Sequence, residues 1–475
     1  MLKRKCKVSY DHDPKYSYAV SAEDYERDGI IGLEPMTAKE LNTEDKIREA
    51  FNNKDNIIEE KFDGTRALLY LVDGGCRVFS RRISKKTGFY VENTDSVPYI
   101  RDSVFDSSMK GTVLDGEMFI PGRDFSLSCG IMNSRYDRAV QQQEKYGYEV
   151  LHVFDILMFE GEDVTKFPLW KRKKLVERVV KQLDNPYVVE VSYSYIKGED
   201  ENCIRVPFNK KMYHRWMRDI HNLTMRFPNL VTIFSREYPD EVLRRMDKVF
   251  LTPMQYYEYV VFNGGEGVMI KNSNGCYHHK RGWEYSKIKK FLTRECIILG
   301  FTEPEKEYKG KFPDPAKWDY WEYKDGNSIN LGTFSYVERS DFIHRTWNKE
   351  DFTPVSKYYY NRWVGNIRLG VVISEEEYKE SSLSKENTSF TFIPSCSIAS
   401  NHTKNIVIEV GDCSGFDEYW REEFSVLRDV YVGKVVEVKA QEVFKKTGKM
   451  RHPRFLRLRP DKNPLDCTWK DHVGE

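Results

Sequence analysis

Several features that mark other protein classes are scarce in this sequence of 475 residues. No segment approaches the roughly 20 consecutive apolar residues that a membrane-spanning helix needs. The basic start of the chain has no apolar stretch behind it, so we expect neither a membrane protein nor a secreted one. The closest of the nine cysteines, Cys396 and Cys413, are 17 residues apart, which excludes a CxxC zinc ribbon and a dense disulfide framework. Such cysteines are typical of free thiols in a reducing compartment.

An excess of charge of one sign is also missing. Lys and Arg number 75 and Asp and Glu number 74, so the net charge of +1 excludes a uniformly basic protein. Three stretches are nevertheless locally basic, at residues 171–181, 280–294 and 434–462. Because clustered Lys and Arg attract phosphates, we expect these stretches to form basic faces able to line a nucleic-acid duplex.

The pattern of apolar runs predicts a mixed α/β domain in the first part of the chain. From Ile57 to Phe79, apolar runs alternate with Asp-Gly and Gly-Gly turns, which predicts three consecutive strands. The sequence has no GxGxxG, so a dinucleotide-binding parallel sheet is not indicated. Further strands are predicted at 111–120, 148–158 and 267–271, and helices at 38–52, 169–182, 210–227, 239–247 and 253–262.

A second, strand-rich section runs from Glu295 to Asp461 and predicts a small β-barrel. Its last hairpin is expected to turn at Lys446–Lys449. A long segment, at about 303–405, interrupts the strands and is rich in Tyr and Trp, including Trp318 and Trp347. These aromatics indicate either a small satellite core or a nucleic-acid clamp that stacks on bases, and we favour the satellite core.

The most distinctive local feature is the hexapeptide Lys61–Arg66, KFDGTR. A lysine held at the end of an apolar strand before an Asp-Gly turn is partly desolvated, which favours the neutral, nucleophilic amine. On the hexapeptide alone, a surface lysine beside a tight turn is an equally good interpretation.

Other short segments carry charges or aromatic rings in similar settings. Glu117 follows Asp115-Gly116, Phe154 precedes Asp155 in a predicted strand, and Glu266 opens the segment EGVMIK. Lys287 and Lys289 project from one face of a strand because side chains alternate with period two. Near the C-terminus stands RLRPDK, with Arg459, Asp461 and Lys462. Each segment alone is more simply a solvated charge or a core aromatic.

Together, the order and spacing of these motifs resemble the covalent nucleotidyltransferases, and most closely the ATP-dependent DNA ligases. Six motifs occur in family order between about Pro35 and Lys462, and PLWKRKKL at 168–175 and GDCSGF at 411–416 also match. Since only 60 residues precede Lys61, the resemblance is to compact viral, phage or bacterial ligases without an N-terminal helical DNA-binding domain.

The resemblance implies an α+β chain of two domains. Residues 1–292 would form a mixed α/β nucleotidyltransferase (ATP-grasp-like adenylation) domain, with an insertion near 186–251. Residues 293–475 would form an OB-fold β-barrel domain, with an insertion near 303–405.

The resemblance also implies the chemistry. Lys61 would attack the α-phosphate of ATP and carry AMP, while Lys287 and Lys289 neutralise the phosphate charge. Mg²⁺ suits the carboxylate ligands that Glu117 and Glu266 offer. Glu59 and Phe154 would bind the base, Arg66 and Arg81 would reach the ribose and phosphates, and Glu117 would contact the ribose. Glu266 would belong to the ATP site as a metal-site carboxylate, and Arg459, Asp461 and Lys462 would orient the leaving pyrophosphate.

The expected substrate is nicked duplex DNA, sealed through a lysyl-AMP and a DNA-adenylate. The alternatives are an RNA ligase, an mRNA-capping guanylyltransferase and, in another class, a non-catalytic nick-binding protein. We expect a monomer located in the cytoplasm, the nucleus or a viral replication site of a host cell.

Overall fold

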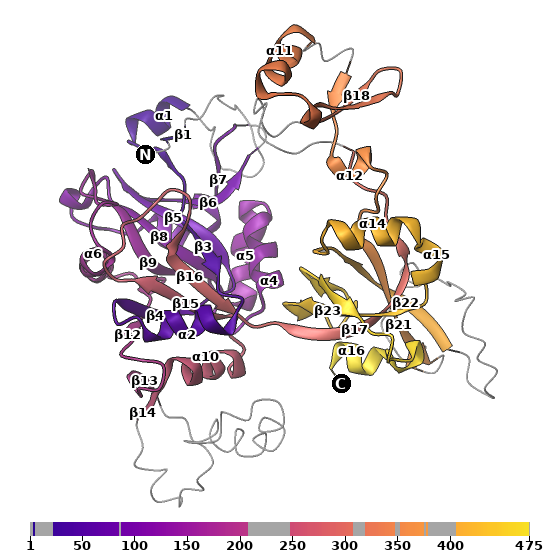
Figure 1. Cartoon of the computed structure of the whole chain (residues 1–475). Helices are drawn as coiled ribbons and strands as arrows, with labels where there is room; N and C mark the ends of the chain where they lie inside the picture. The colour runs from indigo at the N-terminus through magenta and orange to yellow at the C-terminus, as the bar shows by residue number, and fades with distance from the viewer. Residues whose placement is uncertain are drawn as a thin grey trace, which may run out of the picture. The chain divides into compact units, whose positions relative to one another are not determined.

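The structure is a computed structural model that describes residues 3–4, 22–84, 87–207, 248–306, 319–346, 352–374, 377–378 and 405–474. The chain divides into two compact units, Met1–Lys290 and Phe291–Glu475, which are taken in turn below (Figure 1). The helices predicted at 210–227 and 239–247 lie outside the described residues.

The first unit contains a seven-stranded sheet in which β11 pairs in parallel with β9 and the other pairings are antiparallel. The strands predicted from 57 to 79 and at 111–120 and 148–158 are confirmed. In order across the sheet, its strands are β10 (Glu162–Asp163), β9 (Val150–Phe159), β8 (Val113–Phe119), β5 (Thr65–Val72), β6 (Gly75–Ile83) and β7 (Tyr90–Glu92), with β11 (Val188–Glu190) beside β9.

A second sheet of the same unit has five strands. The predicted strand at 267–271 is confirmed, but the helix predicted from residue 38 is wrong at its start. Residues 37–40 instead pair in parallel with a neighbouring strand, and the helix begins only at Glu44. In order, the strands are β12 (Tyr193–Tyr195), β4 (Asn56–Lys61), β15 (Gly267–Asn272), β16 (Arg281–Lys289) and β3 (Thr37–Glu40).

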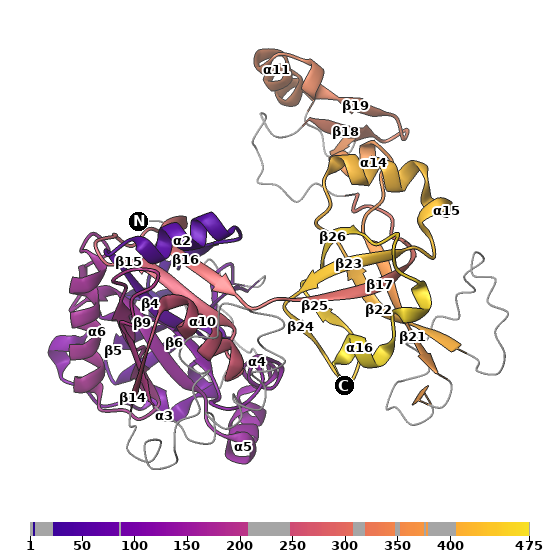
Figure 2. The same cartoon turned by 60° about the horizontal axis from the view of Figure 1, so that its bottom comes forward.

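Helices cover both sheets. Helix α6 (Leu169–Leu183) lies along β9 and packs Val176, Val179 and Leu183 into the core of the larger sheet (Figures 1 and 2). Helix α10 (Pro253–Phe262) begins with a capping box at Thr252 and packs against the smaller sheet through Val260. The other elements of this unit are β1 (Lys3–Arg4), α1 (Ala22–Arg27), β2 (Gly32–Leu33), α2 (Glu44–Asn52), α3 (Pro98–Arg101), α4 (Phe125–Asn133), α5 (Tyr136–Tyr146), β13 (Ile204–Pro207) and β14 (Lys248–Leu251).

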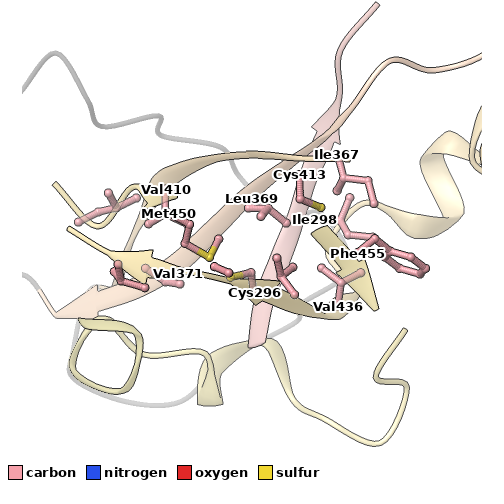
Figure 3. Packing of buried hydrophobic residues seen from close by; sticks show 14 of the residues in the cluster. Cys296, Ile298, Ile367, Leu369, Val371, Val410, Cys413, Val436, Met450 and Phe455 are labelled. Carbon is pink, nitrogen blue, oxygen red and sulfur yellow. The ribbon is translucent and has the colours of Figure 1, made fainter. Parts of the chain in front are cut away.

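The second unit is built on a five-stranded antiparallel sheet whose buried face is shown in Figure 3. A single bridge from Ser414 to Arg454 joins its two edges, which requires the sheet to curl. The predicted last hairpin is confirmed, with β24 (Glu442–Val443) paired to β25 (Met450–Arg451). In order, the sheet strands are β22 (Asn405–Cys413), β21 (Ile367–Ser374), β17 (Leu292–Phe301), β23 (Val435–Ala440) and β26 (Arg454–Leu458).

A small three-stranded sheet, with β18 (Tyr320–Tyr323) at its centre, lies in the segment that interrupts this unit. Trp321 is 0% exposed and packs with Leu331 and Phe352, so it belongs to a satellite core and cannot stack on bases. Trp318 and Trp347 lie outside the described residues. The other elements of this unit are β19 (Ser328–Asn330), α11 (Tyr336–Thr346), β20 (Phe352–Pro354), α12 (Lys357–Tyr360), α14 (Glu418–Val426), α15 (Arg428–Tyr431) and α16 (Trp469–Val473).

No helix in the described part of the chain is long and apolar enough to cross a membrane. The seven cysteines of the described ranges are all free thiols.

Candidate functional site

The strand register of the smaller sheet brings three predicted site residues together. Gly267, the first residue of β15, lies opposite Lys61 on one side and Lys289 on the other. Glu266 precedes this glycine, and its carboxylate contacts Lys61 Nζ through Oε2 and Lys289 Nζ through Oε1 at 2.8 Å. Burial alone would raise the pKa of Glu266, but the two ammonium groups outweigh it and hold that pKa below its usual value.

A tight turn at Phe62–Gly64 joins this cluster to the larger sheet. A Cβ on Gly64 would lie 2.5 Å from the carbonyl oxygen of Met118, so only glycine allows the turn to pass this close to β8. Lys61 therefore ends a strand of one sheet, and Arg66 lies near the start of a strand of the other. The site lies where the two sheets meet.

Arg66 is fixed by a buried acid. Its Nε and Nη2 donate to the two oxygens of Asp115 at 2.5 and 2.6 Å, and the hydroxyl of Tyr277 donates to the same carboxylate at 2.6 Å. The guanidinium carbon of Arg66 lies 4.5 Å from the ring centre of Phe154. Such a bidentate pair holds a positive charge in one orientation beside the aromatic ring.

The side of the site near Phe154 holds a buried group of one acid and two lysines. Glu59 is 1% exposed, and its Oε1 contacts Lys173 Nζ while its Oε2 lies 2.5 Å from Lys271 Nζ. Lys271 Nζ also lies 4.4 Å from the ring centre of Phe154. Burial lowers the pKa of Lys271 to about 8, even though Glu59 acts in the opposite direction.

A second buried ion pair lies next along helix α6. Arg172 Nε and Nη2 donate to the carboxylate of Asp155 at 2.8 and 3.1 Å, and Tyr285 OH donates to the same carboxylate. The expectation that residues 171–181 form one basic face is therefore wrong at Arg172 and Lys173, whose charges point inward to Asp155 and Glu59. Both residues fall on the buried stripe of α6, where the helix faces the sheet.

Several of these groups, among them Lys61, Arg66 and Phe154, border one cavity of about 640 Å³, which is large enough for a nucleotide. Burial raises the pKa of Glu117 to about 7, although Lys61 and Arg66 act against it. The pKa of Lys287 is lowered to about 8 by burial and by repulsion from Lys289 and Lys61. The predicted site residues that line the cavity are Glu59, Lys61, Arg66, Arg81, Glu117, Phe154 and Lys287.

The two predicted metal ligands differ in how well they suit a cation. Glu117 is a partly buried carboxyl group whose charge is disfavoured by burial, so a divalent cation would relieve that penalty. Both oxygens of Glu266 already contact ammonium groups. Within the described ranges, no cluster of three or more His, Cys, Asp or Glu side chains could hold a metal ion.

Arg459, Asp461 and Lys462 lie in the second unit and are described there alone. Arg459 Nη2 lies 2.8 Å from Asp461 Oδ2, and Lys462 Nζ lies 3.0 Å from Glu295 Oε2. Arg459 also contacts Glu295, so Glu295 links the two cations. The three predicted residues form one polar cluster on this unit.

Comparison with known proteins matches residues 35–205 to a family model described as the ATP dependent DNA ligase domain. DNA ligase 4 of Candida albicans is 29% identical over 175 residues, which cover 34% of this chain and 19% of that protein. A DNA ligase of Pyrobaculum arsenaticum is 28% identical over 159 residues, which cover 33% of this chain and 26% of its own length. This chain thus matches about a fifth to a quarter of these two relatives.

A prophage-derived DNA ligase-like protein, LigB of Bacillus subtilis, is 21% identical over 280 residues, which cover 58% of this chain and 77% of the relative. A solved structure from a study of Lig E DNA ligases aligns with 90% of this chain and 98% of its own, at 15% identity and a TM-score of 0.44. The segment matched by the family model contains Lys61, Arg66, Glu117 and Phe154. Over residues 35–205, the chain is therefore similar to the ATP-dependent DNA ligase domain.

Proposed function

We propose that this chain is an ATP-dependent DNA ligase that seals nicks with a 5′-phosphate and a 3′-hydroxyl. The observation that carries the proposal is the cluster of Lys61, Glu266 and Lys289 beside a cavity that also holds Phe154. A lysine nucleophile, cations for a phosphate and an aromatic platform for a base are what nucleotidyl transfer to an amine requires.

In the first step, Lys61 Nζ loses a proton and attacks the α-phosphorus of ATP. The new N–P bond forms as the P–O bond to pyrophosphate breaks. Lys287, which lines the cavity, and Lys289 supply positive charge for the phosphate oxygens. Phe154 would stack on the base next to Glu59, and Arg66 and Arg81 would bind the ribose and phosphates.

Mg²⁺ is the metal that best suits carboxylate and phosphate oxygens at such a site, and when bound it would screen the charge of the triphosphate. Glu117 would hold it. Glu266 would join Glu117 only when Lys61 no longer occupies its Oε2. Arg459, Asp461 and Lys462 of the second unit would orient the departing pyrophosphate.

In the following steps, AMP would pass to the 5′-phosphate of the nick, and the 3′-hydroxyl would then displace AMP to form the phosphodiester bond. The exposed Lys and Arg side chains of residues 280–294 and 434–462 would contact the DNA backbone, which makes binding sensitive to salt. We further propose that the protein acts as a monomer within the cell.

A labelling experiment tests this proposal. The protein is incubated with Mg²⁺ and either α-labelled ATP or α-labelled GTP, and the covalent adduct is quantified. A ligase forms a covalent adduct with ATP that survives denaturation and alkali and is released in acid, as expected of an N–P bond. An adduct with GTP alone would indicate a capping guanylyltransferase, and no adduct with either nucleotide would indicate a non-catalytic nick-binding protein.

The Lys61→Ala variant separates the steps. It should form no adduct and seal no ordinary nick, yet it should still seal a nick that already carries the 5′-adenylate, because the last step needs no lysine nucleophile. Parallel reactions with a nicked RNA strand separate a DNA ligase from an RNA ligase.

A further inference from the structure

Helix α6 places a buried cation next to Glu59, from the segment PLWKRKKL, for which the resemblance implies no residue role. Lys173 is 4% exposed, and its ammonium group contacts Glu59. The next residue, Lys174, is exposed to solvent on the same helix. Burial of an ammonium group is costly unless it is paired, so Lys173 has a specific reason to face inward.

Glu59 is held from two directions. Its neighbours across the sheet are Tyr193 of β12 and Met269 of β15, and Met269 also lines the cavity. Lys173 Nζ forms an ion pair with Oε1 of Glu59, and Lys271 Nζ forms one with Oε2. Lys271 also lies 4.7 Å from the ring centre of Tyr285, and Lys173 lies 5.2 Å from that of Tyr193.

An ionised carboxylate accepts hydrogen bonds and donates none, and its two oxygens offer about four acceptor positions. Within the described residues, Glu59 Oε1 and Lys173 Nζ form an ion pair but neither atom has a hydrogen-bond partner, so Glu59 can still accept from the ligand. The 6-amino group of adenine is a donor, whereas the 6-oxo group of guanine or hypoxanthine is an acceptor. A fixed carboxylate at this point therefore favours a 6-aminopurine and repels a 6-oxopurine.

We propose that Lys173 is a positioning residue that sets the base selectivity of the cavity by fixing Glu59 as a hydrogen-bond acceptor for the 6-amino group of adenine. This inference rests on the proposed nucleotidyl transfer to Lys61. It assigns no contact between Lys173 and the nucleotide, since Lys173 acts through Glu59.

The test compares three triphosphates on the same protein preparation: ATP, purine riboside triphosphate, which lacks the 6-amino group, and inosine triphosphate, which carries a 6-oxo group. The readout is kcat/KM for the covalent adduct. A ratio of two substrates on one variant is independent of the fraction of folded protein. Partial unfolding of a variant therefore cannot imitate the effect.

The variant is Lys173→Met, which keeps the length of the side chain and removes its charge. The preference for ATP over purine riboside triphosphate should fall about tenfold, the equivalent of one charge-assisted hydrogen bond. The preference for ATP over inosine triphosphate should fall at least as far. Lys174→Met, the exposed neighbour, should keep both ratios of the wild type.

A double variant tests the route of the effect. If Lys173 acts through Glu59, Lys173→Met should change the ratios little further in a Glu59→Gln background. Unchanged ratios in Lys173→Met, or additive effects in the double variant, would overturn the inference and leave the proposed function intact. No adduct from any triphosphate with the wild type would overturn the proposed function, and this inference with it.

Discussion

Replacing Gly267 by alanine should damage stability and chemistry together. Gly267 has a φ of +148°, and a Cβ there would overlap the carbonyl oxygen of Ile288 and lie 3.0 Å from the Cα of Lys289. The strained backbone costs about 1–3 kcal/mol and the forced displacement about 1–3 kcal/mol more. We therefore expect the free energy of unfolding to fall by roughly 2–6 kcal/mol, measured by urea denaturation.

The chemical consequence follows from the strand register, because Gly267 lies opposite both Lys61 and Lys289. Pushing β15 away from β16 moves Glu266 from its lysines, and a displacement of about 1 Å at a reacting group costs about 10²-fold in rate. Adduct formation should fall by that factor. Gly264→Ala is the matched control, since Gly264 also has a positive φ, +90°, but nothing lies within 4 Å of the added Cβ. Equal stability and equal adduct rates in the two variants would refute this reasoning.

Three further predictions follow from the buried charges. Because burial raises the pKa of Glu117 to about 7, protons compete with Mg²⁺ for this carboxylate below pH 7. The Mg²⁺ affinity measured through adduct formation should therefore fall about tenfold for each pH unit below 7 and be constant above pH 7, and in Glu117→Gln it should not depend on pH. The lowered pKa of Lys287, about 8, means that its positive charge is lost as the pH rises through 8, so kcat/KM for ATP should decline above pH 8 in the wild type and not in Lys287→Met. Arg172→Met leaves Asp155 as a buried charge without its arginine, so the free energy of unfolding measured by urea denaturation should fall by about 3–5 kcal/mol. The double variant Arg172→Met/Asp155→Leu should recover much of this loss, because it also removes the unpaired charge.

Local patterns in the sequence predicted those parts of the fold that depend on local rules. The strand ending at Lys61 and the turn after it follow from an apolar run and an Asp-Gly pair, and helix α10 was predicted at its observed bounds, Pro253–Phe262. The stretch from residue 38 was misread because its first residues pair with β16, a strand from far along the chain. Residues 37–40 form a strand because they pair with this distant strand, and the local sequence pattern does not indicate that pairing.

The site residues also divide into those that a local pattern indicates and those that depend on partners far away in the sequence. Lys61, Glu117 and Glu266 could be found because each stands beside a glycine or an aromatic residue in or next to a strand. Lys173 was missed, since it reads as one of a run of basic residues. One local signal was present: Lys173 and Arg172 fall on the same helical face as Val176 and Val179. Two cations on an apolar stripe indicate buried acidic partners, but the partners, Glu59 and Asp155, come from strands β4 and β9, and only the folded chain identifies them.

The buried pairs around helix α6 have a consequence for how the protein responds to ionic strength. Salt screens charges that are exposed to solvent, and it screens buried pairs such as Lys173 with Glu59 much less. The base-binding side of the cavity should therefore keep its shape in salt that releases DNA from the exposed lysines and arginines. Under the proposed function, a raised salt concentration would then separate the two halves of the reaction: the protein would still form its nucleotide adduct under conditions in which it no longer binds the nick.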